Sequence, residues 1–212
     1  MSLELQRVLP AEIERRSLEI ITQELDRTLD PEQADVILRV IHASADFTFA
    51  DALCFTPDVC AKAVRALRAG CCVVTDTRMA WSGINKRTLA ALGGEAFCFI
   101  DDPEVAEAAK KNGTTRSAAA MDRAAALGRP TLFAIGNAPT ALVRLCELIE
   151  EKKLLPELVV GVPVGFVNVV ESKELLLRTP VPSIVARGRK GGSPIAAAVV
   201  NALLYRTGER RA

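Results

Sequence analysis

From residue 51 onward, short apolar runs alternate with amphipathic segments of helical spacing, and this alternation limits the fold more than any other feature. The apolar runs are only a few residues long and contain hardly any polar side chain, which is typical of strands buried on both faces. Strands of this kind, separated by helices, form a parallel sheet covered on both sides. The predicted strands cover residues 72–75, 96–100, 131–135, 158–162 and 183–187.

The segments between these strands predict the helical layers. Helices are expected near residues 57–69, 103–111, 116–127, 139–152, 167–177 and 194–206. This alternation of strands and helices predicts an α/β fold, namely a three-layer α/β/α sandwich with a flavodoxin-like parallel five-stranded sheet. Because no Pro/Ser-rich linker and no internal repeat interrupts the pattern, we expect a single domain over residues 1–212.

The N-terminal part, residues 1–50, is expected to be helical and to pack on the α/β core. Residues 17–29 carry apolar side chains at helical spacing. A second helix is predicted over residues 31–43, with Asp30 as its N-cap and Pro31 at its first position.

Composition excludes several classes of function. The net charge is +1 and aromatic residues make up 4% of the chain, so we expect no nucleic acid as a partner. The six cysteines form no C-x-x-C pair and the chain has one histidine, so free thiols and no bound metal are expected. With no signal-peptide core and no apolar stretch long enough to cross a bilayer, the sequence predicts a soluble cytoplasmic protein without membrane contact.

Two loops after predicted strands are candidates for anion binding, because ligands of such sheets bind beyond the carboxyl ends of the strands. "GNAPT", which contains Asn137 and Thr140, opens a helix whose N–H groups favour an anion. The alternative is a simple turn in which Pro139 begins a helix. "RGRKGG", beginning at Arg187, suits a carboxylate or phosphate, or else forms a solvated basic turn.

Two further loops carry weaker signals. "TTRSAA" contains Arg116, which could point to the cleft, and Ser117, although helix capping alone would explain its hydroxyl groups. "PVGFVNVVESKE" places Gly165 between apolar residues at the mouth of a strand, with Glu171 and Lys173 in the helix that follows. A surface helix would supply the same charges, and the sequence does not decide between that alternative and a ligand site. We therefore expect the ligand site on loops, with the helix over residues 31–43 as a candidate wall.

The stretch "RVIHASADF" contains His42, the only histidine of the chain. A lone histidine on an apolar helix is often a core residue, so spacing alone leaves both alternatives open. Two observations favour function. Arg39 lies one turn earlier on the same face and would need an anionic partner if buried. Moreover, no other side chain type here titrates near neutral pH without a perturbed pKa.

Taken in order, seven strings resemble the precorrin-8X methylmutase family and cover nearly the whole chain. They are "ERRSLEII", "RVIHASADF", "TDTRMAWSGI", "TRSAAA", "AIGNAPTAL", "GVPVGFVNVVESKE" and "GRKGGS". The resemblance implies a flavodoxin-like homodimer without a bound cofactor. It also implies an isomerase of cobalamin biosynthesis, which moves a methyl group from C11 to C12 of the corrin ring and gives hydrogenobyrinate or cobyrinate.

By this resemblance, His42 matches the catalytic histidine, and Ser17 and Arg39 match the substrate-contacting serine and arginine. A pericyclic shift needs a macrocycle held in one conformation and one proton donor, so a single imidazole suffices. The acetate and propionate arms of the tetrapyrrole would account for arginines around an apolar cleft. The remaining residues assigned to substrate binding are Arg116, Ser117, Asn137, Thr140, Gly165 and Arg187.

The string "HASADF" is similar to the form typical of the cobalt-early branch of the family, which favours cobalt-precorrin-8 over the metal-free substrate. No metal ligands are expected in either case, because cobalt would arrive inside the substrate. Two rival functions remain. A tetrapyrrole carrier would use the same pocket without turnover, and a nucleotide-dependent α/β enzyme would use the "GNAPT" loop.

Overall fold

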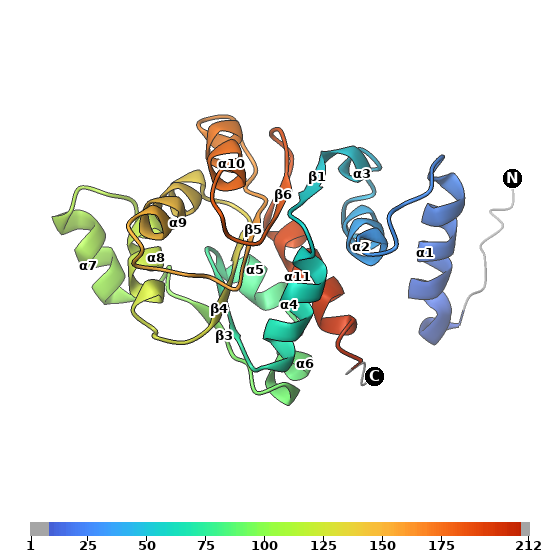
Figure 1. Ribbon diagram of the computed structural model, residues 1–212, viewed down its shortest axis with the longest axis horizontal. Helices are drawn as coiled ribbons and strands as arrows, with labels where there is room; N and C mark the ends of the chain where they lie inside the picture. The colour runs from blue at the N-terminus through green and yellow to red at the C-terminus, as the bar shows by residue number, and fades with distance from the viewer. Residues whose placement is uncertain (1–8, 209–212) are drawn as a thin grey trace, which may run out of the picture.

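A six-stranded sheet lies at the centre of the computed structural model, which describes residues 9–208 apart from the side chain of residue 11 (Figure 1). The strands are β1 (Leu53–Phe55), β2 (Cys72–Thr75), β3 (Ala96–Cys98), β4 (Thr131–Ile135), β5 (Leu158–Gly161) and β6 (Ser183–Ala186). Their spatial order is β1-β6-β5-β4-β2-β3. β1 pairs antiparallel with β6, and every other neighbouring pair is parallel.

The five parallel strands confirm the predicted fold class. Their order, β3-β2-β4-β5-β6, is the 2-1-3-4-5 order of a flavodoxin-like sheet. In this order the chain changes its direction across the sheet between β2 and β4, so the switch point lies between the carboxyl ends of these two strands. All residues of β2, β4, β5 and β6 are buried, as continuous apolar runs require.

The predicted number of strands was too low by one, because β1 was missed. β1 has three residues and directly follows a short helix, α3 (Phe49–Ala52), so it shows no periodic pattern of its own. It forms only by pairing with the edge of the sheet, where Leu53 lies opposite Ala186 and Phe55 opposite Ile184. A tertiary contact, and not local propensity, creates this strand.

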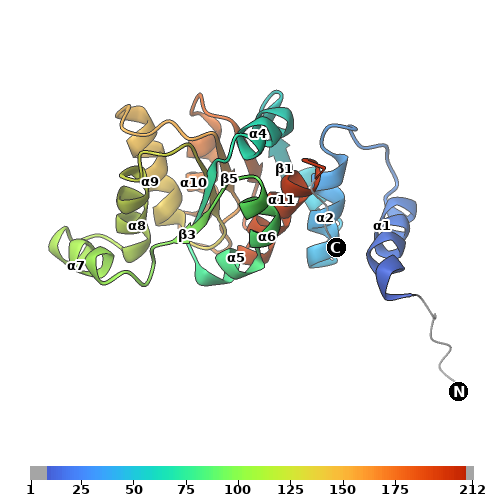
Figure 2. The same ribbon diagram turned by 90° about the horizontal axis from the view of Figure 1, so that it is seen from below.

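Helices cover both faces of the sheet and give the three predicted layers (Figure 2). On β4, Leu132 and Ala134 face one core together with α2, α4 and α11, whereas Phe133 and Ile135 face a second core with α8, α9 and α10. No helix within residues 9–208 has the length and apolarity needed to cross a membrane. The helices, after a 3-10 turn at Pro10–Glu12, are α1 (Ile13–Glu24), α2 (Ala34–Ser44), α3, α4 (Val59–Arg68), α5 (Arg78–Gly83), α6 (Lys86–Ala91), α7 (Pro103–Lys111), α8 (Arg116–Ala125), α9 (Pro139–Glu150), α10 (Val169–Leu177) and α11 (Ser193–Tyr205).

Of the two N-terminal helices, α2 packs against α11, and α1 packs against the outer side of α2 (Figures 1 and 2). Both begin and end at residues other than those predicted. α1 ends at Glu24, and α2 begins at Ala34 because residues 31–33 form a separate turn. Asp30 does cap this turn, since its carboxylate accepts the Glu32 N–H at 2.9 Å. The predicted domain limits, residues 1–212, extend beyond the described residues at both ends.

Two short helices, α5 and α6, occupy the region after β2, where no helix was predicted. Each has six residues, which is too short for a periodic apolar pattern. Side-chain caps define them instead. Thr77 accepts the Ala80 N–H at 3.1 Å, and Asn85 accepts the Thr88 N–H at 3.0 Å.

Candidate active site

The parallel strands all end at one edge of the sheet, which we call the carboxyl edge. Because β1 is antiparallel, its first residue Leu53 lies at this edge, opposite Ala186 at the end of β6. α2 and α3 come shortly before β1 in the chain, and the loop after α2 contacts the loop after β6. There the Lys190 Nζ lies 2.7 Å from Asp46 Oδ2. The last turn of α2 is therefore close to the carboxyl edge.

His42 lies in this last turn of α2, and its side chain is exposed. The neighbouring Val40 and Ile41 are fully buried, so aliphatic side chains and not the imidazole form the core-facing side of the helix. The interpretation of His42 as a core histidine is therefore wrong. One turn further on, hydrogen bonds from Lys190 and Thr48 lower the pKa of the Asp46 carboxyl to about 2.

Asp76 fills the crevice at the switch point. Its carboxylate accepts hydrogen bonds from the backbone N–H groups of Gly136 at 2.9 Å, Asn137 at 2.8 Å and Ala138 at 2.7 Å. Burial raises the pKa of this carboxyl, and the three N–H donors act in the opposite direction. The N–H groups of "GNAPT" that were predicted to favour a ligand anion thus already bind an anion of the protein. The side chains of Asn137 and Thr140 remain exposed.

The basic residues of "RGRKGG" all have partners within the chain. Arg187 pairs with Glu174 at 3.0 Å, and the guanidinium of Arg189 lies 5.5 Å from the centre of the Phe166 ring. Lys190 bonds to Asp46, as described above. A substrate carboxylate would therefore compete with internal contacts at Arg187, whereas Arg189 holds an aromatic ring and keeps its N–H groups for other acceptors.

Arg116, Ser117 and Thr140 lie at the start of two adjacent helices, α8 and α9. Thr115 caps α8 by accepting the Ala118 N–H, and its hydroxyl donates to Thr140 Oγ1 at 2.9 Å. The capping function that the sequence left open thus belongs to Thr115. Thr140 lines a pocket of about 470 Å³ between α8, α9 and the loop before α10. Arg116 is exposed and forms no ion pair with any residue of 9–208.

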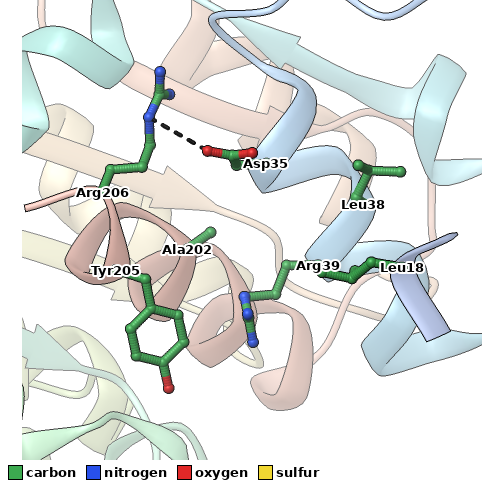
Figure 3. Close-up of a pocket in the computed structure, with 7 residues that line it drawn as sticks. All are labelled: Leu18, Asp35, Leu38, Arg39, Ala202, Tyr205 and Arg206. Carbon is green, nitrogen blue, oxygen red and sulfur yellow. Dashed lines mark ion pairs between the residues drawn. The ribbon is translucent and has the colours of Figure 1, made fainter. Parts of the chain in front are cut away.

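Arg39 lies in a different pocket, of about 370 Å³, between α1, α2 and α11 (Figure 3). Its guanidinium pairs with Glu14 of α1 and stacks 4.6 Å from the centre of the Tyr205 ring. Ser17 is not among the residues that line this pocket, although the next residue, Leu18, is; the Ser17 hydroxyl donates to the Ile13 carbonyl at 2.9 Å. His42 is not among the residues that line the pocket. The expected anionic partner of Arg39 is therefore present, and it comes from the protein.

Gly165 shapes an apolar rim at the carboxyl edge. Its φ of 145° lies in a region that other residues rarely adopt, and its N–H donates to the Arg189 carbonyl at 3.2 Å. The turn displays the neighbouring Phe166 with 82% of its surface exposed. Met79, after β2, is another large exposed apolar residue at the same edge. Val164 and Val167, on either side of Phe166 in the same turn, are exposed as well, so this turn presents several apolar side chains together, as ligand and partner surfaces do.

Sequence reasoning did not predict that two charged residues near this edge, Asp76 and Lys173, are buried. Asp76 could have been found, because an acidic residue directly after a fully apolar strand stands at the carboxyl end of that strand. Lys173 was expected in the helix after Gly165, but nothing in the sequence indicated its burial, because a lysine within a helix is usually solvated. The six cysteines are free, and no group of potential metal ligands occurs among residues 9–208.

An open parallel sheet of this order, with an exposed imidazole near its carboxyl edge, defines a flavodoxin-like α/β protein, a class whose ligands bind beyond the carboxyl ends of the strands. Comparison with family models narrows this class. Residues 12–206 match the model for Precorrin-8X methylmutase, and the chain belongs to this family. It is therefore an isomerase, a methylmutase that transfers a methyl group within one molecule.

Known relatives are similar over nearly the whole chain. A cobalt-precorrin-8 methylmutase of Salmonella typhimurium is 49% identical, with 92% of this chain and 95% of the relative covered. One of Priestia megaterium is 44% identical, with 92% and 88% covered. The crystal structure of a precorrin-8X methyl mutase from Thermus thermophilus superposes with a TM-score of 0.85 at 36% identity, covering 93% of this chain and 98% of that one.

The Asp76 contact yields a prediction about stability. Asp76→Ala leaves three buried or partly buried N–H groups without an acceptor, so we expect the free energy of unfolding to fall by about 3 kcal/mol. Urea unfolding followed by circular dichroism measures this change. Asp51→Ala is the matched control, because it removes an exposed carboxylate paired with Arg27 and should cost about 0.5 kcal/mol. Equal losses in the two variants would contradict the importance of Asp76.

Proposed function

We propose that the chain catalyses the migration of a methyl group from C11 to C12 of a precorrin-8 macrocycle, with His42 as the general acid. One observation carries this proposal. The only imidazole of the chain is exposed at the end of α2, close to the carboxyl edge where ligands of such sheets bind. The family to which the chain belongs supports the reaction type.

The chemistry makes few demands on the protein. A methyl shift within a conjugated ring needs no external nucleophile, since the bond that breaks and the bond that forms belong to the same molecule. The protein must hold the macrocycle in a reactive conformation and donate one proton to polarise the conjugated system. A positioned imidazolium fulfils the second requirement.

Surfaces near the carboxyl edge fit the first requirement. The exposed apolar side chains Met79, Val164 and Phe166 offer contact area to a flat, largely apolar macrocycle. Arg116, which forms no ion pair within residues 9–208, is available to a carboxylate arm. Ser117, Asn137, Thr140, Gly165 and Arg187 are proposed to complete the wall.

Arg39 and Ser17 are proposed to contact the substrate from the pocket beside α1. In this pocket Glu14 presents a carboxylate to Arg39, in the manner in which a substrate arm would do so. A substrate carboxylate would then replace Glu14. This exchange keeps the partly buried guanidinium paired in both states, which avoids the cost of leaving its charge without a partner.

We propose cobalt-precorrin-8 as the natural substrate. The form of the "HASADF" string and the names of the two relatives above support this choice. Parallel assays with cobalt-precorrin-8 and metal-free precorrin-8 test this choice, and faster conversion of the metal-free form would contradict it.

We further propose a cytoplasmic location, supported by six free cysteines.

The rival functions make different demands. A tetrapyrrole carrier would bind the substrate and leave its visible spectrum at that of the bound form, whereas methyl migration changes the conjugation and hence the spectrum. A nucleotide-dependent enzyme would need the backbone N–H groups of "GNAPT", which the Asp76 carboxylate occupies. Incubation with the substrate, followed by visible absorbance, therefore separates the enzyme from the carrier.

We expect a homodimer in solution. α1 packs on the body through α2, and Ile13 at its start remains exposed, which leaves apolar surface for a partner. The family resemblance points the same way. Light scattering at micromolar concentration should give twice the single-chain mass of 22.8 kDa. A mass equal to that of a single chain under these conditions would contradict the proposed homodimer.

His42→Ala should give a folded protein that binds the tetrapyrrole but converts it roughly 10²–10⁴ times more slowly, because a positioned general acid is lost. The exposure of His42 predicts an unchanged thermal melt, since no core contact is removed. Single-turnover conversion and a melt of the same variant provide the measurement. Near-normal conversion by a stable variant that still binds substrate would rule out His42 as the acid.

Arg39→Ala should weaken substrate binding roughly ten- to hundredfold and affect the rate of bound substrate less, because a carboxylate contact persists in ground and transition states. This follows from about 1.5–3 kcal/mol for a charge-assisted hydrogen bond. Ser17→Ala, which removes a neutral hydroxyl, should cost less. Arg129→Ala is the control, because Arg129 precedes β4 at the opposite edge and pairs with Glu95. If Arg39→Ala kept its affinity for the substrate and lost turnover, the assignment of Arg39 to substrate binding would be wrong.

A further inference from the structure

Lys173 of α10 is the largest charged side chain that the fold buries completely, with 0% of its surface exposed. A buried ammonium group is costly unless it is paired or fully hydrogen-bonded. Within residues 9–208 Lys173 makes no ion pair with a carboxylate. Burial lowers its pKa to about 8. An apolar side chain of the same size at this position would normally give a more stable protein. The buried lysine therefore indicates a role other than stability.

The partners of Lys173 are two backbone carbonyls of the loop after β6. Its Nζ donates to the carbonyl oxygens of Gly188 at 2.7 Å and Lys190 at 2.8 Å. For both oxygens to face inward, the loop must fold around the ammonium group, and Gly188 accordingly has a φ of 78°. Gly191 approaches so closely that a Cβ there would lie 2.1 Å from the Val162 carbonyl oxygen. Two sets of contacts thus hold the backbone of this loop, the hydrogen bonds of Lys173 and the close approach of Gly191 to Val162.

This loop is connected directly to the end of α2. The backbone of Lys190 is fixed by Lys173, and its side chain donates to Asp46 Oδ2 at 2.7 Å and to Thr48 Oγ1 at 2.9 Å. Asp46 follows Ala45, the left-handed residue that ends α2. His42 lies one turn earlier. A short series of contacts thus runs from the buried ammonium group through Lys190 and Asp46 to the helix end that carries the imidazole.

We infer that Lys173 is a positioning residue for the methyl migration, which sets the place of the α2 end, and so of His42, through the Lys190–Asp46 bond. The inference rests on the proposed function of His42. Lys173 does not touch the substrate, since the loop covers it completely. A glycine-rich loop can adopt many backbone conformations, and the two hydrogen bonds of Lys173 stabilise one of them. We infer that this is why a charged side chain is kept in the core.

Lys173→Met tests the inference, because methionine keeps an unbranched apolar stem and removes all N–H donors. We expect single-turnover conversion to slow roughly ten- to hundredfold, since small displacements of a catalytic group have effects of this size. Affinity for the tetrapyrrole should change by less than about threefold, because a displaced His42 affects the rate of the reaction and not the binding of the substrate. A structural effect alone would lower the melting temperature and reduce affinity and rate together. Lys153→Met, an exposed lysine before β5, is the matched control and should leave both unchanged.

Asp46→Asn and Lys190→Met interrupt the same connection at partly or fully exposed positions, so they test it even if Lys173→Met fails to fold. Each should slow conversion by severalfold at least, and Lys173→Met combined with Asp46→Asn should be no slower than Lys173→Met alone. Normal conversion in Asp46→Asn and Lys190→Met would overturn the inference. Independent, multiplicative losses in the double variant would do the same.

Combination with His42→Ala separates this inference from the proposed function. If Lys173 acts by positioning His42, then Lys173→Met should add little to the loss already caused by His42→Ala. A full additional loss in that background would refute the positioning role and leave the general acid intact. Near-normal conversion by His42→Ala itself would instead refute the proposed function, whatever Lys173→Met does.

Discussion

The three hydrogen bonds that Asp76 accepts from Gly136, Asn137 and Ala138 govern the arrangement of the carboxyl edge. In a flavodoxin-like sheet the crevice at the switch point is the usual ligand site, because loops diverge there and helix N-termini point into it. Here the Asp76 carboxylate accepts the hydrogen bonds of those N–H groups. These three N–H groups are therefore not available to a ligand, which is why the proposed substrate contacts lie on the outer parts of the loops and on α2.

The loops at this edge are fixed to one another by close approach. A Cβ at Gly136 would lie 2.7 Å from Ser193 Cα at the start of α11, and the Thr77 hydroxyl lies 2.7 Å from that of Ser193. The Gly192 N–H donates to the Val162 carbonyl at 2.9 Å. Such contacts hold the loops in fixed positions relative to one another. A fixed arrangement suits the proposed rearrangement within one molecule, in which correct positioning of the macrocycle is the main requirement.

Local sequence signals were reliable where burial on both faces or a capping residue defined an element. The five apolar runs became the five parallel strands, and Pro139 begins α9 as expected. They failed where an element depends on a distant partner or is very short. β1 exists through its pairing with β6, and α5 and α6 are six residues long. The start of α2 was misplaced because the Asp30 cap serves a separate turn before the helix.

The sequence by itself determined the class of fold, the family and the identity of the only imidazole, because buried strands, ordered motifs and a single histidine are properties of the chain alone. Only the tertiary structure decided what each charged group contacts. It paired Arg39 with Glu14, Arg187 with Glu174 and Lys190 with Asp46, and it buried Asp76 and Lys173 against backbone groups. Hydrogen bonds and ion pairs join residues far apart in the chain, so local periodicity and motif spacing carry no information about them.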